Sequence, residues 1–182
     1  MGRILFDTAA TLNGFLADDD HSLAWLFAVE GGTEPDPTLL PQAATVMVEG
    51  SHTYEWVLRE WGALADPTTW REFHGDRPLF VFTSRELPVP EGADVRFVRG
   101  GVAEALPAIR AAAGDGDIWV VGGGDLAGQF LDAGALDELA VSIAPVALPS
   151  GAPLLPRRVE SDRLELVEAR QVGQFARLVY RV

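Results

Sequence analysis

Cysteine and lysine are both absent from the 182 residues. Without cysteine the chain has no disulfide, no thiolate metal site and no thiol nucleophile. Without lysine it can neither form a Schiff base nor supply the lysine of a nucleotide-binding P-loop. Long apolar runs are missing too. The longest, residues 139–148, contains Ser142 and Pro145 and is far shorter than the roughly 20 residues of a membrane-spanning helix.

Positive charge is scarce: 14 basic residues, all arginine, stand against 27 acidic residues, which gives a formal net charge of −13. Such a surface repels nucleic-acid phosphates and anionic lipids, so we expect a small molecule rather than nucleic acid or membrane as partner. The three histidines show no ligand spacing, and we predict no metal site. No signal-peptide-like apolar segment is present at the N-terminus, which predicts a cytoplasmic location.

The 48% hydrophobic content is typical of a folded domain, and we expect one domain over residues 1–182. Strand-like and helix-like patterns alternate, about eight strands with four helices. The first expected helix covers residues 22–29, is capped by Ser22 and is ended by Gly31-Gly32. A second follows Gly50 and is capped by Ser51 or Thr53. The other two cover residues 102–113, with Pro107 in the first turn or at a kink, and residues 125–134. The expected strands are 3–12, 45–48, 79–85, 95–98, 118–121 and 139–148, followed by a hairpin around Gly173.

Strands separated by helices of about ten residues are typical of a mostly parallel sheet, and the terminal hairpin predicts an antiparallel edge. The sequence therefore predicts a mixed α/β sheet. Ligands of such sheets bind beyond the carboxyl ends of the strands. The residues that follow each strand are therefore the first candidates for a functional site.

The strongest local signal is Gly122-Gly123-Gly124 between a strand and a helix. Glycines there let phosphates approach the backbone, and the N-terminus of the next helix attracts anions, so a pyrophosphate would fit. A flexible strand-to-helix turn is the alternative. The pattern also matches a relaxed dinucleotide fingerprint, but Val141 and Ser142 stand about 20 residues further on, where that fingerprint needs an acid. A Rossmann domain is therefore disfavoured.

Two further strand ends can hold phosphate. Thr83–Arg85 offers two hydroxyls and a guanidinium for a terminal phosphate, and the alternative is a solvated strand end. Gly50–Thr53 joins a buried strand to a helix N-terminus, where His52 by itself is more often a surface or capping residue. Three such strand ends in one sheet favour a phosphorylated ligand.

Asp7 lies within an otherwise apolar strand and shares a face with Leu5, Ala9 and Thr11 under strand alternation. A desolvated carboxyl there would have a raised pKa and could donate a proton near neutral pH. A hydrogen-bonded structural aspartate is the alternative. Trp25, beside an Asp-rich loop, is either a core residue or a cover for a flat ring.

The order of these motifs resembles the dihydrofolate-reductase-like family, particularly the branch similar to the reductase domain of the riboflavin-biosynthesis deaminase-reductase. The similar stretches are 8–17, 46–55, 79–85, 117–131 and 138–155. The resemblance implies a single-domain fold with a central mixed, mostly parallel sheet of about eight strands, flanking helices and an antiparallel C-terminal hairpin. It also implies NADPH across the strand ends and a homodimer.

The resemblance assigns a role to each motif. The nicotinamide would contact Ala9 and Leu16, the phosphates Gly50, His52 and Thr53, the 2′-phosphate Thr83, Ser84 and Arg85, and the pyrophosphate region Gly122, Gly123, Gly124, Asp125, Leu126 and Gln129. On the substrate side we predict Asn13, Ser22, Trp25 and Leu26. For Asp7 we predict proton supply or substrate orientation.

Three positions depart from the family pattern. Ser22 stands where true dihydrofolate reductases have an acid, Ser51 where the family usually has arginine, and Asn13 where the deaminase-reductase branch commonly has aspartate. We therefore predict a stand-alone reductase that uses NADPH to reduce a C=N or C=O bond of a small heterocyclic, pyrimidine- or pterin-like molecule. The alternatives are a non-catalytic nucleotide-binding protein on the same fold and a genuine dihydrofolate reductase.

Overall fold

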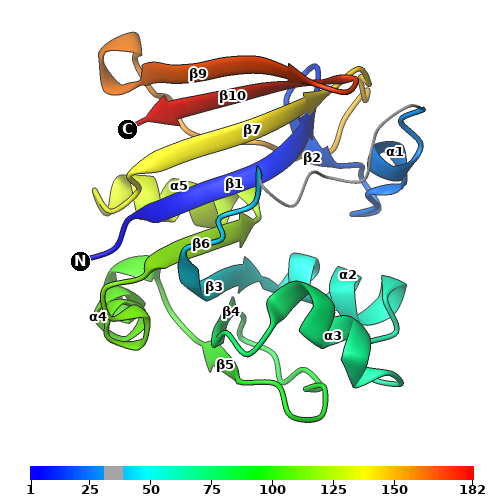
Figure 1. Cartoon of the computed structure of the whole chain (residues 1–182), viewed down its shortest axis with the longest axis vertical. Coiled ribbons are helices and arrows are strands. Elements are labelled where there is room, and N and C mark those ends of the chain that lie inside the picture. The colour runs from blue at the N-terminus through cyan, green and yellow to red at the C-terminus, as the bar shows by residue number, and fades with distance from the viewer. Residues whose placement is uncertain (31–38) are drawn as a thin grey trace.

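The computed structural model describes residues 1–30 and 39–182. A central eight-stranded sheet has the order β5-β4-β3-β6-β1-β7-β10-β9 (Figure 1). The first six strands of this order are mutually parallel, and β10 and β9 complete the sheet as an antiparallel pair. In chain order the strands are β1 (Ile4–Thr11), β3 (Ala44–Gly50), β4 (Leu79–Phe82), β5 (Val95–Val98), β6 (Asp117–Gly122), β7 (Glu138–Ala144), β9 (Glu165–Val172) and β10 (Phe175–Arg181).

Helices pack on both faces of this sheet (Figure 1). The helices in these layers are α2 (Ser51–Glu60), α3 (Pro67–His74), α4 (Val102–Ala113) and α5 (Gly124–Asp132), and the chain also has the short helix α1 (Ala24–Phe27) and the 3₁₀ turn η2 (Ser161–Arg163). Two short strands, β2 (Phe15–Ala17) and β8 (Ala152–Pro153), form a separate antiparallel pair. None of the described helices has the length and apolar character needed to cross a bilayer.

Strand alternation divides the core into two layers. On one face Ile4 and Phe6 of β1 pack with α4 and α5, through residues such as Ile109 and Phe130. On the other face buried side chains of β3, β4 and β6 pack with α2 and α3. They are Met47, Leu79, Val81 and Trp119 from the strands, and Tyr54, Val57, Leu58 and Trp70 from the helices. Both faces of the sheet are therefore covered by helices, which leaves the edge where the strands end as the place for a site.

The fold predicted from the sequence is confirmed, with the hairpin turning at Gly173, where φ is 57°. The helix predicted at 102–113 has these bounds. However, Pro107 lies inside α4, beyond its first turn. The strand predicted at 139–148 ends at Ala144 because Pro145 has no N–H for the ladder.

Two predicted helix starts are wrong. The first helix begins at Ala24 with Leu23 as N-cap and ends at Phe27, while Ser22 Oγ accepts from the Ala24 N–H at 3.1 Å in the turn before it. The predicted stop at Gly31-Gly32 lies outside the described residues. In the second helix Gly50 is the N-cap and makes no side-chain hydrogen bond. Because β3 runs directly into α2, Ser51 is already helical and neither it nor Thr53 caps.

Four of the described elements were not predicted: helix α3, the short strands β2 and β8, and the 3₁₀ turn η2. Helix α3 begins with Asp66, whose carboxylate accepts from the Thr68 N–H at 3.0 Å, followed by Pro67 in the first turn. This is a strong helix start, and the Asp-Pro pair is the signal that could have revealed it. Strand β8 has two residues and depends on β2 for its pairing. A segment this short has no periodicity to read.

Candidate functional site

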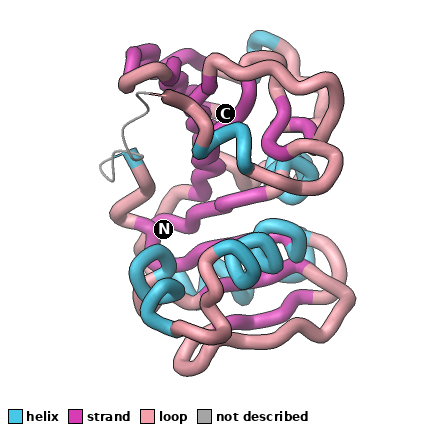
Figure 2. The backbone as a smooth tube through the Cα atoms, turned by 90° about the vertical axis from the view of Figure 1, so that its right-hand side faces the viewer, coloured by secondary structure: helices cyan, strands magenta, loops and turns pink. Residues whose placement is uncertain are grey.

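The carboxyl ends of the six parallel strands lie at one edge of the sheet, which faces the viewer in Figure 2. The strand order places the ends of β4, β3, β6 and β1 side by side. Thr83, Gly50 and Gly122 follow or close three of these strands, and Ala9 lies near the end of the fourth. Residues that are up to about a hundred positions apart in the chain therefore form one row.

Two helix N-termini meet in the middle of this row. Gly50 is the N-cap of α2 and Gly123 the N-cap of α5, and neither cap makes a side-chain hydrogen bond. A Cβ added at Gly50 would lie 3.7 Å from the Gly123 nitrogen, so the two junctions are neighbours. A Cβ at Gly123 would meet nothing within 4 Å, so this glycine faces open space. The Gly122-Gly123 peptide is cis.

This junction fits a pyrophosphate. The first N–H groups of each helix lack a partner within that helix, and both macrodipoles place partial positive charge at the same point. The third glycine has a different role. A Cβ at Gly124 would lie 2.2 Å from the Pro153 carbonyl oxygen and 2.4 Å from that of Leu154, so close packing against β8 requires glycine there.

Other side chains predicted around the pyrophosphate are occupied within the chain. Gln129 Nε2 donates to Asp125 Oδ2 at 3.1 Å, and Arg157 Nη1 donates to Asp125 Oδ1 at 3.0 Å. These bonds, first that of Gln129 and then that of Arg157, lower the pKa of Asp125. Leu126 is buried in the core. Asp125 and Leu126, in the first turn of α5, can therefore meet a phosphate through their backbone N–H groups, whereas Gln129 lies beyond that turn, where the N–H groups are bonded within the helix.

At the β4 end of the row, Arg85 is held by a residue that the sequence analysis missed. Its Nη1 and Nη2 donate to the two carboxylate oxygens of Glu55 on α2, at 2.9 and 2.5 Å. Thr83 Oγ1 accepts from the Arg85 N–H at 3.0 Å, and Ser84 is exposed beside it. Glu55 lies one helical turn after Ser51, and this spacing is the signal that could have placed it near the phosphate site.

His52, at the start of α2, stacks on the ring of His21 with centroids 4.0 Å apart and planes at 17°. Burial lowers the pKa of His52, and the charges of His21 and Arg85 lower it further, while Glu55 acts in the opposite direction. In the free protein this lowered pKa favours the neutral imidazole, which can donate a hydrogen bond to a phosphate.

At the β1 end, Ala9 is half-buried and Leu16 of β2 is buried. The turn between these strands is fixed by Asn13, whose Nδ2 donates to the Leu148 carbonyl at 2.7 Å and whose Oδ1 accepts from the Leu148 N–H at 3.1 Å. Thr11 Oγ1 also donates to Asn13 Oδ1 at 3.0 Å. Asn13 thus anchors the first loop to the loop after β7 through both polar atoms of its amide.

Helix α1 and the turn before it lie against α2, since His21 stacks on His52 and Phe27 stacks on Trp56. Trp25 is buried, and its Nε1–H has no hydrogen-bond partner. Leu26 is half-buried, and the Ser22 N–H donates to Asp18 Oδ1 at 2.8 Å. An unpaired buried donor costs free energy. The indole N–H of Trp25 is therefore a buried donor without an acceptor among the described residues.

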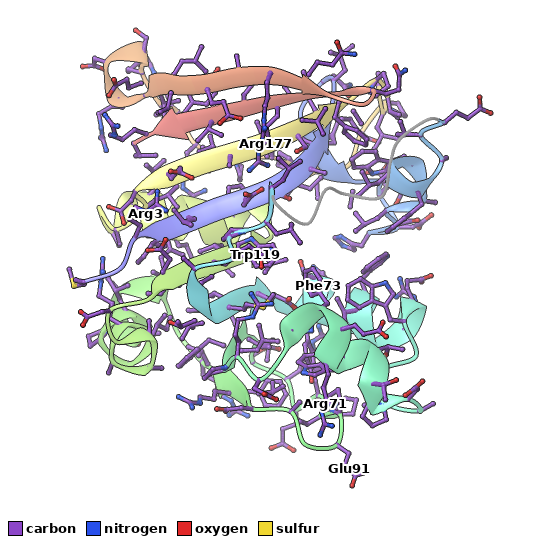
Figure 3. All side chains as sticks on the ribbon, viewed as in Figure 1. Arg3, Arg71, Phe73, Glu91, Trp119 and Arg177 are labelled. Carbon is purple, nitrogen blue, oxygen red and sulfur yellow. The ribbon has the colours of Figure 1, made fainter. Side chains whose placement is uncertain are left out.

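A row of aromatic rings continues from α1 across α2 and α3 to β6. The aromatic row consists of Phe27, Trp56, Trp61, Phe73 and Trp119. Consecutive centroids are 5.9, 5.7, 5.1 and 5.4 Å apart, and Figure 3 labels Phe73 and Trp119 at its inner end. The outermost ring, Phe27, is 65% exposed. The inner end, Trp119, is part of the buried core, so the outer rings, Phe27, Trp56 and Trp61, are the ones exposed enough to suit contact with a flat molecule.

Asp7 is held in a buried ion pair. Arg177 of β10 donates to both carboxylate oxygens of Asp7, at 2.7 and 2.5 Å, and the Trp119 indole donates to the Asp7 backbone carbonyl. Burial raises the pKa of Asp7 and the Arg177 guanidinium opposes that shift. The pair lines a pocket of about 340 Å³ together with Arg3 and Asp117. Because these two residues lie at the amino ends of β1 and β6, the pocket extends away from the glycine junction.

Within residues 1–30 and 39–182, no group of three or more His, Asp or Glu side chains is placed to hold a metal ion. The three histidines take part in ring stacking instead: His21 with His52, and buried His74 with Trp70 at 3.7 Å. Buried His74 also lies 3.1 Å from Glu49 Oε1.

Comparison with known proteins identifies the fold and the family. Residues 3–177 match the RibD C-terminal domain family. The chain is 28% identical to the uncharacterized protein YwjB of Bacillus subtilis, over 94% of this chain and 93% of that protein.

Solved structures with lower identity share the fold. One is the Thermotoga maritima diaminohydroxyphosphoribosylaminopyrimidine deaminase/5-amino-6-(5-phosphoribosylamino)uracil reductase, with TM-score 0.68, 16% identity, and coverage of 99% of this chain and 56% of that one. Another is the dihydrofolate reductase of Enterococcus faecalis complexed with NADP(H), with TM-score 0.61, 16% identity, and coverage of 99% and 96%. The chain therefore belongs to the RibD C-terminal domain family and has a dihydrofolate-reductase-like fold.

Proposed function

We propose that the chain is a reductase that uses NADPH to reduce a C=N or C=O bond of a small planar heterocyclic molecule. One observation carries the proposal: the N-termini of α2 and α5, neither of which has a side-chain capping bond, meet at Gly50 and Gly123 beside open space. The strand order then gives a dinucleotide a continuous path from the Ala9 end to the Arg85 end. The NADP(H) complex of the Enterococcus faecalis enzyme supports this choice of ligand.

When bound, NADPH supplies a hydride, and the substrate carbon accepts it while the attached nitrogen or oxygen takes a proton. The residues of this chain bind and orient. The helix N-termini hold the pyrophosphate, Leu16 and Ala9 pack on the nicotinamide, and the aromatic row with the Trp25 N–H positions a flat ring. Asp7 is the candidate for proton supply or orientation, and its bond to Arg177 favours orientation.

Ser22 favours a substrate other than dihydrofolate, because a hydroxyl at this position cannot hold a protonated pterin as a carboxylate does. The same substitution supports the second candidate, a non-catalytic nucleotide-binding protein on this fold. The third candidate function is genuine dihydrofolate reduction. Each of the three predicts a different pattern of binding and turnover.

Calorimetry with NADPH, followed by turnover assays with pterins, pyrimidines and cyclic imines, separates these candidates. We expect NADPH to bind and at least one such compound to be reduced. Binding without turnover of any compound would favour the non-catalytic protein, and turnover of dihydrofolate with methotrexate inhibition would favour a dihydrofolate reductase. Absence of coenzyme binding to the folded protein would remove the proposal.

We also propose that the chain acts in the cytoplasm as a homodimer. The surface of β9 is exposed along almost its whole length, including Leu166 and Val167, which are 54% and 53% exposed. Exposed apolar side chains on an edge strand are a ready surface for association with a second copy.

A further inference from the structure

The adenosine end of the proposed coenzyme site has a single charged donor among its predicted ligands. Thr83 and Ser84 are neutral, and Ser51 stands where the family usually has arginine, which leaves Arg85 to neutralise a 2′-phosphate. Arg85 is already engaged: both of its terminal nitrogens donate to Glu55 in a two-bond, fork-like pair.

Glu55 is firmly part of this end of the site. It lies on α2 one turn after Ser51, and its side chain is one-third exposed while that of Arg85 is half exposed. The register pairs Gly50 of β3 with Phe82 of β4, so the start of α2 and Thr83–Arg85 are adjacent. A phosphate that reached Arg85 would therefore also reach the carboxylate of Glu55.

The two coenzymes make different demands on this pair. A 2′-phosphate must draw Arg85 from Glu55 or share it, and in either case two anions come close together. A ribose with free hydroxyls can instead donate to Glu55, because a carboxylate keeps lone pairs free after accepting two hydrogen bonds. Arg85 then stays where it is.

The neighbouring histidine does not change this balance. His52 is close enough to Glu55 and Arg85 to be affected by both charges, and burial and its stacking partner His21 lower its pKa, which favours the neutral ring. Thr83 and Ser84 carry only neutral hydroxyls. The charges of Arg85 and Glu55 cancel, so this end of the site has no net charge.

We infer that Glu55 determines coenzyme specificity by withholding Arg85 from the 2′-phosphate, so that the chain accepts NADH as well as NADPH. This inference rests on the proposed function, because it needs the dinucleotide to lie along the strand ends. It concerns only the adenosine half, which can be tested without a substrate.

Calorimetry with the two adenosine halves, 2′,5′-ADP and 5′-ADP, tests the inference at low ionic strength, where charge effects are largest. Wild-type protein should bind both with affinities within about tenfold of each other. Glu55→Gln should tighten 2′,5′-ADP by about threefold to tenfold and leave 5′-ADP unchanged or weaker. Arg85→Ala should abolish any preference for 2′,5′-ADP.

Glu60→Gln is the matched control, because Glu60 forms an exposed ion pair with Arg59 on the same helix. It should change neither affinity. Glu55→Ala is a second variant with no carboxylate, and it should shift the ratio of the two affinities in the same direction as Glu55→Gln. Circular dichroism and thermal melting check that each variant is folded.

Failure of the inference and failure of the proposed function give different results. If folded wild-type protein binds neither nucleotide, the coenzyme site itself is wrong. If both nucleotides bind but neither Glu55 variant shifts their affinity ratio beyond that of Glu60→Gln, Glu55 does not set specificity while the reductase proposal stands.

Discussion

Asp7 and Arg177 are each more than nine-tenths buried and satisfy each other through two hydrogen bonds. A buried ion pair is costly to break from one side, because the remaining charge is left in a poorly solvating environment. The sequence could place Asp7 on a strand face but could not reveal Arg177, which is 170 positions away. The pair therefore gives Asp7 a structural role in addition to any role in the reaction.

We predict that Asp7→Asn lowers the free energy of unfolding by about 3–5 kcal/mol, whereas the double variant Asp7→Leu/Arg177→Met is close to wild type. Urea unfolding monitored by tryptophan fluorescence measures both. The double variant also tests catalysis, since it is stable without the carboxylate. Unchanged turnover in that variant would rule out Asp7 as proton donor, and a single variant as stable as wild type would contradict the structural role.

His52 gives a pH-dependent prediction. Its pKa is lowered in the free protein by burial, His21 and Arg85, and a bound phosphate would raise it by favouring the charged imidazole. Binding should then take up protons, so coenzyme affinity should increase as the pH falls through the pKa of the bound state. NMR titration of the histidine signals with and without NADPH measures this.

His52→Asn is the control, and in this variant the pH dependence should be reduced. A bound-state pKa of His52 that is equal to or lower than that of the free protein would show that no phosphate lies beside it.

At the scale of elements, the glycine triplet separates a binding role from a packing role. Gly123 faces open space with φ −92°, which alanine adopts readily, whereas a Cβ at Gly124 would collide with the Pro153 and Leu154 carbonyls. We predict that Gly124→Ala lowers stability by about 1–3 kcal/mol through overpacking. Gly123→Ala should fold normally and bind NADPH at least tenfold more weakly, because its methyl group fills the proposed pyrophosphate space.

Thermal melting and calorimetry on the two variants check this prediction, with each variant serving as the control for the other. Normal NADPH affinity in a folded Gly123→Ala protein would place the pyrophosphate elsewhere. A fully stable Gly124→Ala protein would show that α5 can move away from β8.

Local patterns explain why some elements were predictable. The helix at Val102–Ala113 and the strand-to-glycine junction at Gly122 depend on periodicity and turn residues within a few positions. The signal for helix α3, its Asp66-Pro67 start, was equally local. The helix was nevertheless not predicted because it is short and has a polar face. Element type therefore followed from neighbours in the chain.

The pairing of charged side chains could not be predicted from neighbours in the chain. Glu55 meets Arg85 across 30 positions and Asp7 meets Arg177 across 170, and both pairs depend on which strands are adjacent. Strand order is a property of the whole sheet, and no spacing in the sequence encodes it. The family resemblance supplied the row of strand ends, but not the acid that neutralises Arg85 within it.

At the scale of the whole molecule, charge and the exposed β9 surface act in opposite directions. Each chain carries a net charge of −13, so two copies repel at low ionic strength. Apolar side chains on β9 favour association. Dimer formation by this surface should therefore strengthen as salt screens the repulsion, over the range in which the Debye length falls from about 30 Å to 10 Å.

We predict that the protein is a dimer by light scattering after size exclusion at 0.15 M salt, and that Leu166→Glu is a monomer, because a buried unpaired carboxylate opposes association. Leu64→Glu is the matched control. Leu64 is 47% exposed on the segment between α2 and α3, away from β9, and its replacement should leave the mass unchanged. A monomeric wild type, or a dimer that survives Leu166→Glu, would place any association elsewhere. A mass that falls with added salt would show that ion pairs rather than apolar contacts hold the two copies together.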